Sequence, residues 1–303
     1  MILTRLPDLP PRPESAANAL FRRQFYARWG RENAVVCGRS TLAEYAAMAQ
    51  TLSIKMALGG RERYLLPRRE LVVDDDTLLV LNEGARYGSV LQSERPAWSF
   101  AVFFRPGMQH EVAAQQARGL QAALDDPGPP GPAQPVRPIG FAEHLRPRQG
   151  PVGARLQQMA QQIAAGERSE AWLEEQLTLL LADLLKQEHA PPPAGSTRPA
   201  LRAELRRRLL LAADLIQSHD PQALTLDRLA AEASLSRFHF VREFSRLFGA
   251  SPHAYLTRKR ARVAQRLLAA GATDPDRVAQ ACGLGSRWSL RRALARHGNE
   301  PAP

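Results

Sequence analysis

Two helix-turn-helix patterns within residues 224–298 constrain this chain more than any other feature of its sequence. In the first, a short apolar helical period is interrupted at Ser236, which suits a helix N-cap, and Gly249 ends the helix that follows. Phe240 and Phe244 give that second helix one apolar face. Its other face and its N-terminal end carry Ser236, Arg237, Phe238, Val241, Arg242 and Ser245. Arginine and an adaptable aromatic residue in front of an apolar back are typical of a recognition helix.

The pattern partly repeats after a helix predicted over residues 252–269. Ser286 is a second N-cap candidate, and Leu290 and Leu294 are expected to face inward. The residues expected outside or at the N-terminal end are Arg287, Trp288, Arg291 and Arg292. A helix of this length spans about 27 Å, so it could hold two recognition helices about one DNA turn apart, in successive major grooves. For Trp288 two placements stay open, outward in a groove or inward under the connecting helix.

Many spaced positions of this region agree with one protein family. They are Leu229-Ala230, Ser236, Arg242-x-Phe244, Gly249-x-Ser251-Pro252, Tyr255-Leu256, Arg260, Ala264 and Leu267-Leu268. With them, about the last hundred residues resemble the AraC/XylS family of bacterial transcription regulators. The resemblance implies two helix-turn-helix subdomains, binding to double-stranded DNA, and usually activation of a promoter, with RNA polymerase as a partner.

The second unit departs from the family pattern. Leu284, Leu290 and Leu294 stand where phenylalanines are usual, Trp288 replaces a small polar residue, and one residue is missing before Gly298. We therefore expect the first unit to supply more of the sequence discrimination than the second.

The charge of the chain is concentrated in the same region. Residues 196–303 hold 19 Lys and Arg against 9 Asp and Glu, whereas the other 195 residues hold 22 against 21. A basic excess that coincides with a recognition-helix pattern indicates phosphate contacts. The alternative is a solvated basic face without a partner.

The cysteines and the start of the chain exclude several classes of protein. Cys37 and Cys282 have no paired spacing, which argues against a disulfide framework and favours two buried small hydrophobic residues over redox sensing. No signal peptide is expected, and the apolar runs are far shorter than the roughly 20 residues of a membrane span. We expect a cytoplasmic protein that does not contact membranes.

Short apolar strands are predicted in the first part of the chain. Residues 52–58 alternate with a period of two, and runs at 64–66, 71–73, 78–81 and 98–104 follow, separated by turn residues. This rhythm predicts a small β-barrel or sandwich, similar to the cupin-type sensor of AraC-family proteins. A helix within 106–124, a proline-rich loop from Asp125 and a last strand at 139–141 are also expected. Residues 1–18 look like a loose arm, and 21–45 show no clean period.

Catalytic and metal-binding motifs are missing from the first part. Residues 1–195 hold no His-x-His pair, so a metal-dependent cupin enzyme is not expected. No nucleophile elbow, phosphate loop or activated Cys–His pattern occurs there. We therefore expect no catalytic residue, metal or cofactor, with an enzyme that carries a helix-turn-helix domain as the weaker alternative.

An effector site can be suggested from one strand. Trp98, Phe100 and Phe104 share a face, which would make an aromatic pocket for a small organic effector if it lined the barrel interior. Arg86 and Tyr87 would hold a carboxylate or hydroxyl at its mouth. Alternatively these aromatics fill a closed core, or a partner protein controls the chain.

Two amphipathic helices are predicted next, the second after the N-cap candidate Ser169. Its wide leucine stripe either packs on its own barrel or forms part of a two-fold homodimer interface through Leu173, Leu177, Leu181 and Leu184. The predicted α+β organisation is a sensor at 1–150, a connecting and dimerisation segment at 151–186, a linker at 187–199, and an all-α DNA-binding domain at 200–303.

Overall fold

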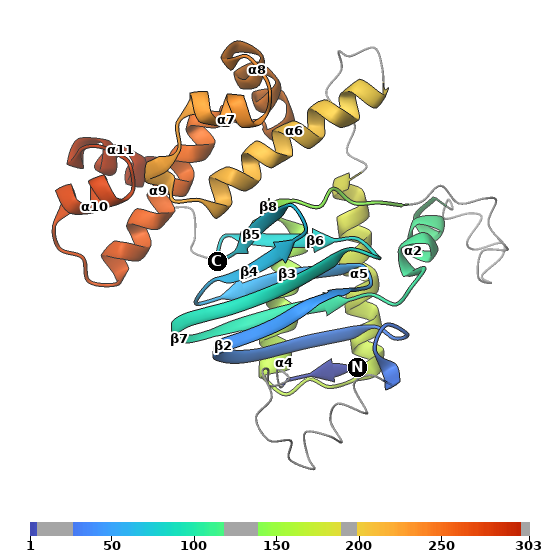
Figure 1. The fold of residues 1–303 in the computed structure, drawn as a ribbon. Helices are drawn as coiled ribbons and strands as arrows, with labels where there is room; N and C mark the ends of the chain where they lie inside the picture. The colour runs from blue at the N-terminus through green and yellow to red at the C-terminus, as the bar shows by residue number, and fades with distance from the viewer. Residues whose placement is uncertain (5–26, 118–138, 189–198, 298–303) are drawn as a thin grey trace. The chain divides into compact units, whose positions relative to one another are not determined.

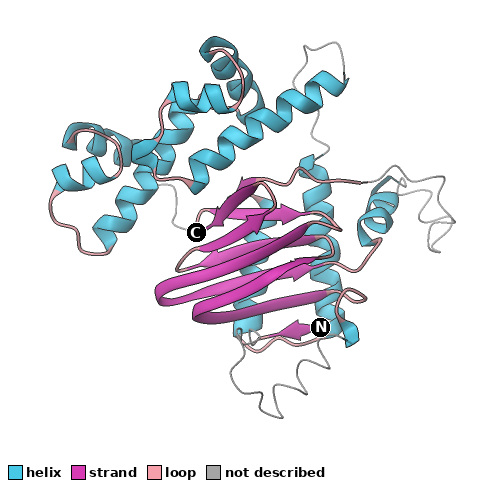
Figure 2. Ribbon diagram, viewed as in Figure 1, coloured by secondary structure: helices cyan, strands magenta, loops and turns pink. Residues whose placement is uncertain are grey.

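The chain separates into two compact units, Met1–Ala190 and Pro191–Pro303. The computed structural model describes residues 1–4, 27–117, 139–188 and 199–297 (Figure 1). A sheet with covering helices makes up the first unit, whereas the described part of the second is entirely helical (Figure 2). The predicted α+β class is confirmed. In the described residues, no helix combines the length and the apolar character that crossing a membrane requires.

An eight-stranded sheet is the frame of the first unit. Its strands are β1 (Ile2–Leu3), β2 (Ala34–Ala49), β3 (Ser53–Leu58), β4 (Glu62–Leu66), β5 (Arg69–Val73), β6 (Thr77–Leu81), β7 (Arg86–Phe103) and β8 (Leu145–Pro147). The hydrogen-bonded order is β1-β2-β7-β3-β6-β8, and β4 pairs with both β5 and β7. Only the β1–β2 pair is parallel.

The long strands β2 and β7 form an antiparallel ribbon that carries the rest of the sheet. The C-terminal part of β7 pairs with β3, from Trp98 to Phe103, and the N-terminal part pairs with β4, from Gly88 to Leu91. Because one strand serves two neighbours, the sheet curls, and side chains from β3 to β8 meet in one buried cluster inside the curl. The sequence predicts a barrel; the described strands instead follow a path with two ends, β1 and β8.

Three helices accompany the sheet: α2 (Met108–Ala117), α4 (Pro151–Ala164) and α5 (Glu170–Glu188). Helices α4 and α5 lie side by side across one face of the sheet (Figure 1). Their apolar stripes form the main core together with the face of β3 that holds Ile54 and Met56. Both helices follow the predicted pattern, and the Ser169 hydroxyl accepts a hydrogen bond from the Trp172 backbone N–H near the start of α5, at 3.3 Å.

The leucine stripe of α5 is covered by the unit's own core. Leu173, Leu177, Leu181 and Leu184 are at most 1% exposed and pack in the cluster that joins the sheet to α4. A side chain already buried within one chain has no surface left for a second. The structure therefore supports packing on the sheet, and the assignment of these four leucines to a dimer contact is corrected.

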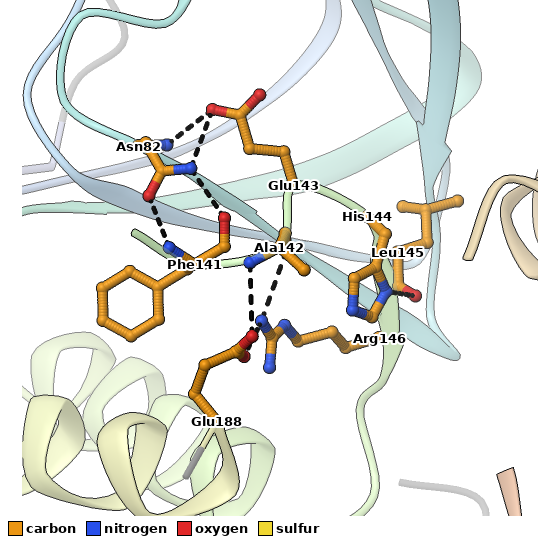
Figure 3. Close-up of polar contacts among 8 residues, drawn as sticks. All are labelled: Asn82, Phe141, Ala142, Glu143, His144, Leu145, Arg146 and Glu188. Atoms are coloured by element: carbon orange, nitrogen blue, oxygen red, sulfur yellow. Dashed lines mark hydrogen bonds and ion pairs between the residues drawn. The ribbon is translucent and has the colours of Figure 1, made fainter. Parts of the chain in front are cut away.

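The segment before β8 is not the strand that the sequence predicts at 139–141. It has no regular secondary structure up to Glu143 and is fixed by side chains instead (Figure 3). The Asn82 side chain accepts from the Phe141 backbone N–H at 2.8 Å and donates to its carbonyl at 2.7 Å. Arg146 donates to Glu188 at the end of α5, at 2.7 Å. These contacts replace the missing sheet pairing. The strand in this region begins later, as β8, and pairs with β6.

The described helices of the second unit are as follows: α6 (Pro199–Ser218), a 3-10 helix η1 (Pro221–Ala223), α7 (Leu226–Glu232), α8 (Arg237–Phe248), α9 (Pro252–Ala269), α10 (Pro275–Ala281) and α11 (Arg287–His297). Most of the predicted arm at 1–18, the proline-rich loop from Asp125 and most of the linker at 187–199 lie outside the described residues. Both cysteines are free and buried, as predicted. Burial raises the pKa of the Cys37 thiol to about 11, which disfavours the reactive thiolate.

Candidate nucleic-acid interface

The first helix-turn-helix unit is α7, a tight turn and α8. The Thr225 hydroxyl accepts from the Arg228 backbone N–H at the start of α7, and the Ser236 hydroxyl accepts from the His239 backbone N–H at the start of α8. These two caps satisfy amide groups that have no partner within the helix. Gly249 ends α8 with a left-handed φ of 66°, which glycine adopts without steric cost. The predicted N-cap and C-cap of the recognition helix are confirmed.

The second helix-turn-helix unit, α10 and α11, repeats this construction about fifty residues later. Asp274 caps α10, and the Ser286 hydroxyl accepts from the Ser289 backbone N–H at the start of α11. Both turns contain a left-handed residue, Ser234 with φ 51° in the first and Gly283 with φ 71° in the second. Glycine suits the second turn, since a Cβ on Gly283 would lie 2.9 Å from the backbone of Gln222.

Helix α9 connects the two helix-turn-helix units over the predicted range, residues 252–269. Tyr255 and Leu256 pack in the core of the first helix-turn-helix unit, and Ala264 packs in that of the second. Arg260 donates to the carbonyls of Pro221 and Leu224 at 2.9 and 3.2 Å, which ties α9 to the connection before α7. Burial lowers the pKa of Arg260 from its ordinary value. One helix thus fixes both helix-turn-helix units in a single frame.

The predicted readout residues of α8 lie on its accessible side. Phe240 and Phe244 are buried behind them, while Phe238 is 70% exposed. The Arg242 guanidinium carbon lies 5.6 Å from the centre of the Phe238 ring. The remaining predicted positions are Ser236 and Arg237, both exposed, and Val241 and Ser245, both partly exposed. Ser245 uses its hydroxyl to donate to the Val241 carbonyl.

Helix α11 presents a matching surface. Trp288 is 65% exposed, so the structure supports its outward placement rather than packing under α9. The Arg292 guanidinium carbon lies 5.3 Å from the centre of the Trp288 ring. Arg287 and Arg291 are exposed beside this pair, and Leu290 is buried. The arginine and the ring are four residues apart in both helices, so one helical turn brings them together.

The two helices differ in how their arginines are neutralised. On α8, Arg242 and Arg246 contact the Glu243 carboxylate at 2.8 and 3.1 Å, and Arg237 lies 3.5 Å from Asp227. The α11 arginines, Arg287, Arg291, Arg292 and Arg296, form no ion pair with any described residue. Glu243 was not among the predicted site residues, although its spacing of three from Arg246 is a signal for such a pair.

The predicted effector residues are not brought together in one place. Phe100 and Phe104 are buried in the core under α4 and α5, and Trp98 packs against that core half-buried. Tyr87 is buried on the inner side of the curl, whereas Arg86 is exposed. The face of β7 that carries Trp98 and Phe100 therefore meets the helices instead of lining the interior. The alternate residues of β7, such as Ser99, face the interior.

Polar side chains line the inner side of the curl, and the sequence reading missed them. Lys55 and Glu62 are each 2% exposed, and Ser53 and Ser99 are buried with them. The Ser99 hydroxyl donates to the Glu62 carboxylate at 2.7 Å. A charged residue in a short alternating strand usually indicates a solvent-facing side. The sequence therefore does not predict that Lys55 is buried. Among the described residues no cluster of His, Cys, Asp and Glu has the arrangement of a metal site.

Comparison with known proteins identifies the second unit. A family model described as a helix-turn-helix domain matches residues 229–302. The probable transcriptional regulator LumQ from Photobacterium leiognathi is 31% identical over 97 residues, which cover 32% of this chain. The match spans 39% of LumQ, so this chain aligns with about two fifths of that relative's length.

Solved structures give weaker likenesses. The DNA-binding domain of AdpA, in complex with a target DNA, is 31% identical and covers 33% of this chain and 86% of that one, with a TM-score of 0.27. ToxT from Vibrio cholerae O395 is 10% identical over 87% of this chain and 92% of its own, with a TM-score of 0.31.

The capped helix pairs, the connecting helix and the matched model all concern the same residues. Residues 229–302 of the second unit therefore form an AraC-type helix-turn-helix domain, and the family resemblance of the sequence falls on the same residues.

Proposed function

We propose that this chain is a sequence-specific DNA-binding transcription regulator whose first unit responds to a small organic effector. The observation that carries the proposal is the repeated arginine-over-aromatic pair on the exposed faces of α8 and α11. An arginine can donate two hydrogen bonds to guanine, and an apolar ring suits the thymine methyl group in the major groove. Both groups stand on helices whose backs are buried, so little ordering is required on binding.

The proposed division of labour follows from the charges. Arg242, Phe238 and Val241 of α8 would read base edges, with Ser236, Arg237 and Ser245 at the flanks of the same surface. The arginines of α11, which form no ion pair with a described residue, would together with Trp288 contact the DNA backbone at the next groove. Contacts of this second kind fix register without reading sequence.

The proposal is tested by selecting duplexes from a random pool and measuring anisotropy on the selected duplex and on a scrambled one at fixed salt. We expect the selected duplex to bind at least tenfold more tightly, and binding to fall steeply with salt. Equal affinity for both duplexes would reduce the chain to a nonspecific DNA-binding protein and contradict the proposal.

Control by a small effector is supported by the polar inner side of the first unit. An interior that only fills space would be apolar, whereas this one holds Lys55, Glu62 and two serines. Control by a partner protein is the second candidate. Two experiments separate these candidates. A thermal-shift screen against metabolites detects a small effector, and a pull-down from lysate detects a partner protein. A homodimer, activation of a promoter and contact with RNA polymerase remain part of the proposal, and none of them rests on the buried leucines of α5.

A further inference from the structure

Lys55 is a buried amine whose nitrogen has no oxygen partner among the described residues. It lies in the middle of β3 and is 2% exposed. Its ammonium nitrogen lies 3.5 Å from the centre of the Phe103 ring and 5.1 Å from that of Tyr87. No hydrogen bond or ion pair joins the Lys55 side chain to another residue in the described ranges. Its direct contacts are therefore two ring faces, and the charge of Glu62 acts on it from further away.

Two rings are poor compensation for the lost hydration of an ammonium. Burial disfavours the charged form, and it holds the pKa of Lys55 well below its ordinary value. Buried charges in proteins are as a rule paired and hydrogen-bonded. An unpaired lysine at this depth is a cost that the fold does not need, because methionine or leucine would fill the same space. Such residues are concentrated at binding sites.

The nearest carboxylate is already engaged. Glu62 accepts from Ser99 at 2.7 Å, and its charge favours the protonated form of Lys55, although no ion pair joins the two side chains. The Tyr87 hydroxyl lies 3.4 Å from the Ser53 hydroxyl. Burial raises the pKa of Tyr87, so its phenol stays a neutral donor. The inner face thus offers hydroxyl groups and aromatic rings near the Lys55 nitrogen, but no described side chain there accepts a hydrogen bond from Lys55.

We propose that the inner side of the first unit binds a small organic monocarboxylate whose carboxylate group accepts a hydrogen bond from Lys55. One cation calls for one negative charge, and a dianion such as a phosphate monoester would bring its second charge close to Glu62. A neutral ligand would leave the ammonium uncompensated. The carbon skeleton would lie against Phe103 and Tyr87. This inference rests on the proposed control by a small effector and names its chemical class.

The test uses the full-length protein with straight-chain monocarboxylates from acetate to octanoate, with benzoate, and with the amide of each acid. We expect one or more acids to raise the thermal midpoint and to bind in calorimetry at least tenfold more tightly than the matching amide. Calorimetry in two buffers of different ionisation enthalpy should show proton uptake, because an anion restores the charged form of Lys55. The other titratable groups on this face are Glu62, Tyr64 and Tyr87.

Two variants locate the site. Lys55→Met keeps the shape of the side chain, and it should lose at least tenfold in acid affinity; Lys186→Met removes an exposed lysine of α5 and should bind as the parent does. If Lys55→Met fails to fold, Tyr87→Phe, which keeps the ring, should still weaken acid binding several-fold. Absence of binding by every acid, equal binding of acids and amides, or undiminished binding in Lys55→Met overturns the inference. Binding of Lys55→Met to the selected duplex reports on the proposed DNA function separately, and we expect no change there.

Discussion

The guanidinium of Arg242 is held over the ring of Phe238, with 5.6 Å between the guanidinium carbon and the ring centre. Fifty residues later Arg292 lies over Trp288 at 5.3 Å. The pairs occupy equivalent places one turn from the N-terminal ends of α8 and α11. Their surroundings differ, because Glu243 accepts from Arg242 in α8 whereas the equivalent residue in α11 is the buried Ala293. Arg242 is fixed on two sides and Arg292 on one.

Arg242→Ala should cost about 1–3 kcal/mol on the selected duplex and relax preference at one base pair, because a two-bond contact to guanine is lost. Arg246→Ala is the matched control, since Arg246 shares the Glu243 carboxylate but lies a further turn along the helix. The measurement is anisotropy on duplexes that carry each substitution at each position. Equal weakening on all duplexes would make Arg242 a phosphate contact.

Glu243→Gln should act in opposite directions on specific and nonspecific binding. Glu243 holds the Nε of Arg242 at 2.8 Å, which leaves the two terminal nitrogens for a base. The variant removes one negative charge near DNA, so affinity for a scrambled duplex should rise severalfold. The ratio of specific to nonspecific affinity should fall by more than that rise. A ratio that is unchanged or larger would show that Glu243 does not position Arg242.

Alanine at Arg287, Arg291 and Arg292 together should lower affinity on every duplex and flatten the salt dependence. Each lost phosphate contact reduces the slope of log K against log salt by about 0.9. We expect base preference in the second groove to change little, because no carboxylate of the described residues contacts these side chains and orients them toward bases. Strong loss of preference at a second set of base pairs would contradict this and give α11 a reading role.

The DNA-binding unit could be predicted closely from its sequence because local signals agree there. Caps such as Ser236, the terminating Gly249 and one apolar stripe define each helix without help from distant residues. The outward placement of Trp288 was left open, since a large apolar ring is as common under a helix as outside it. Glu243 was missed because a carboxylate on a basic face looks like an ordinary solvated residue.

The first unit was less predictable, for reasons visible in two strands. In β2 the register shifts between Ser40 and Leu42 and again between Tyr45 and Met48, so its side chains change faces and no period of two survives. In β3 both faces are buried, one under helices and one inside the curl, and Lys55 is buried on the inner face. Alternation reveals a strand, but it does not tell which side meets water when both are covered.

Leu177→Asp should prevent folding of the first unit, because it places a charge in a core position that is fully buried. Leu179→Asp, two residues along α5, is the matched control: Leu179 is 39% exposed, and the variant should stay folded. Circular dichroism melts and light scattering report on both. A folded, soluble Leu177→Asp monomer would restore the dimer assignment of the stripe, whereas a change from dimer to monomer in Leu179→Asp would place an interface on the exposed side of α5.

Asn82→Ala should destabilise the first unit by about 1–3 kcal/mol, the usual cost of leaving buried backbone groups without partners. Asn82 makes paired hydrogen bonds to the N–H and carbonyl of Phe141, and its amide also donates to Glu143 at 3.2 Å (Figure 3). The segment around Phe141 has no regular secondary structure, and Arg146, five residues later in β8, continues the attachment by donating to Glu188.

Urea unfolding followed by tryptophan fluorescence measures this, since Trp29, Trp98 and Trp172 all belong to the first unit. Glu143→Gln is the control: its amide oxygen can still accept from Asn82, so the loss should stay below about 1 kcal/mol. Loss of the Asn82 contacts should also expose the segment to proteolysis before the sheet unfolds, because the segment depends on side chains and the sheet on backbone pairing. Unchanged stability and unchanged cleavage in Asn82→Ala would mean that the packing of Phe141 and the contacts with Glu188 hold the segment in place without Asn82.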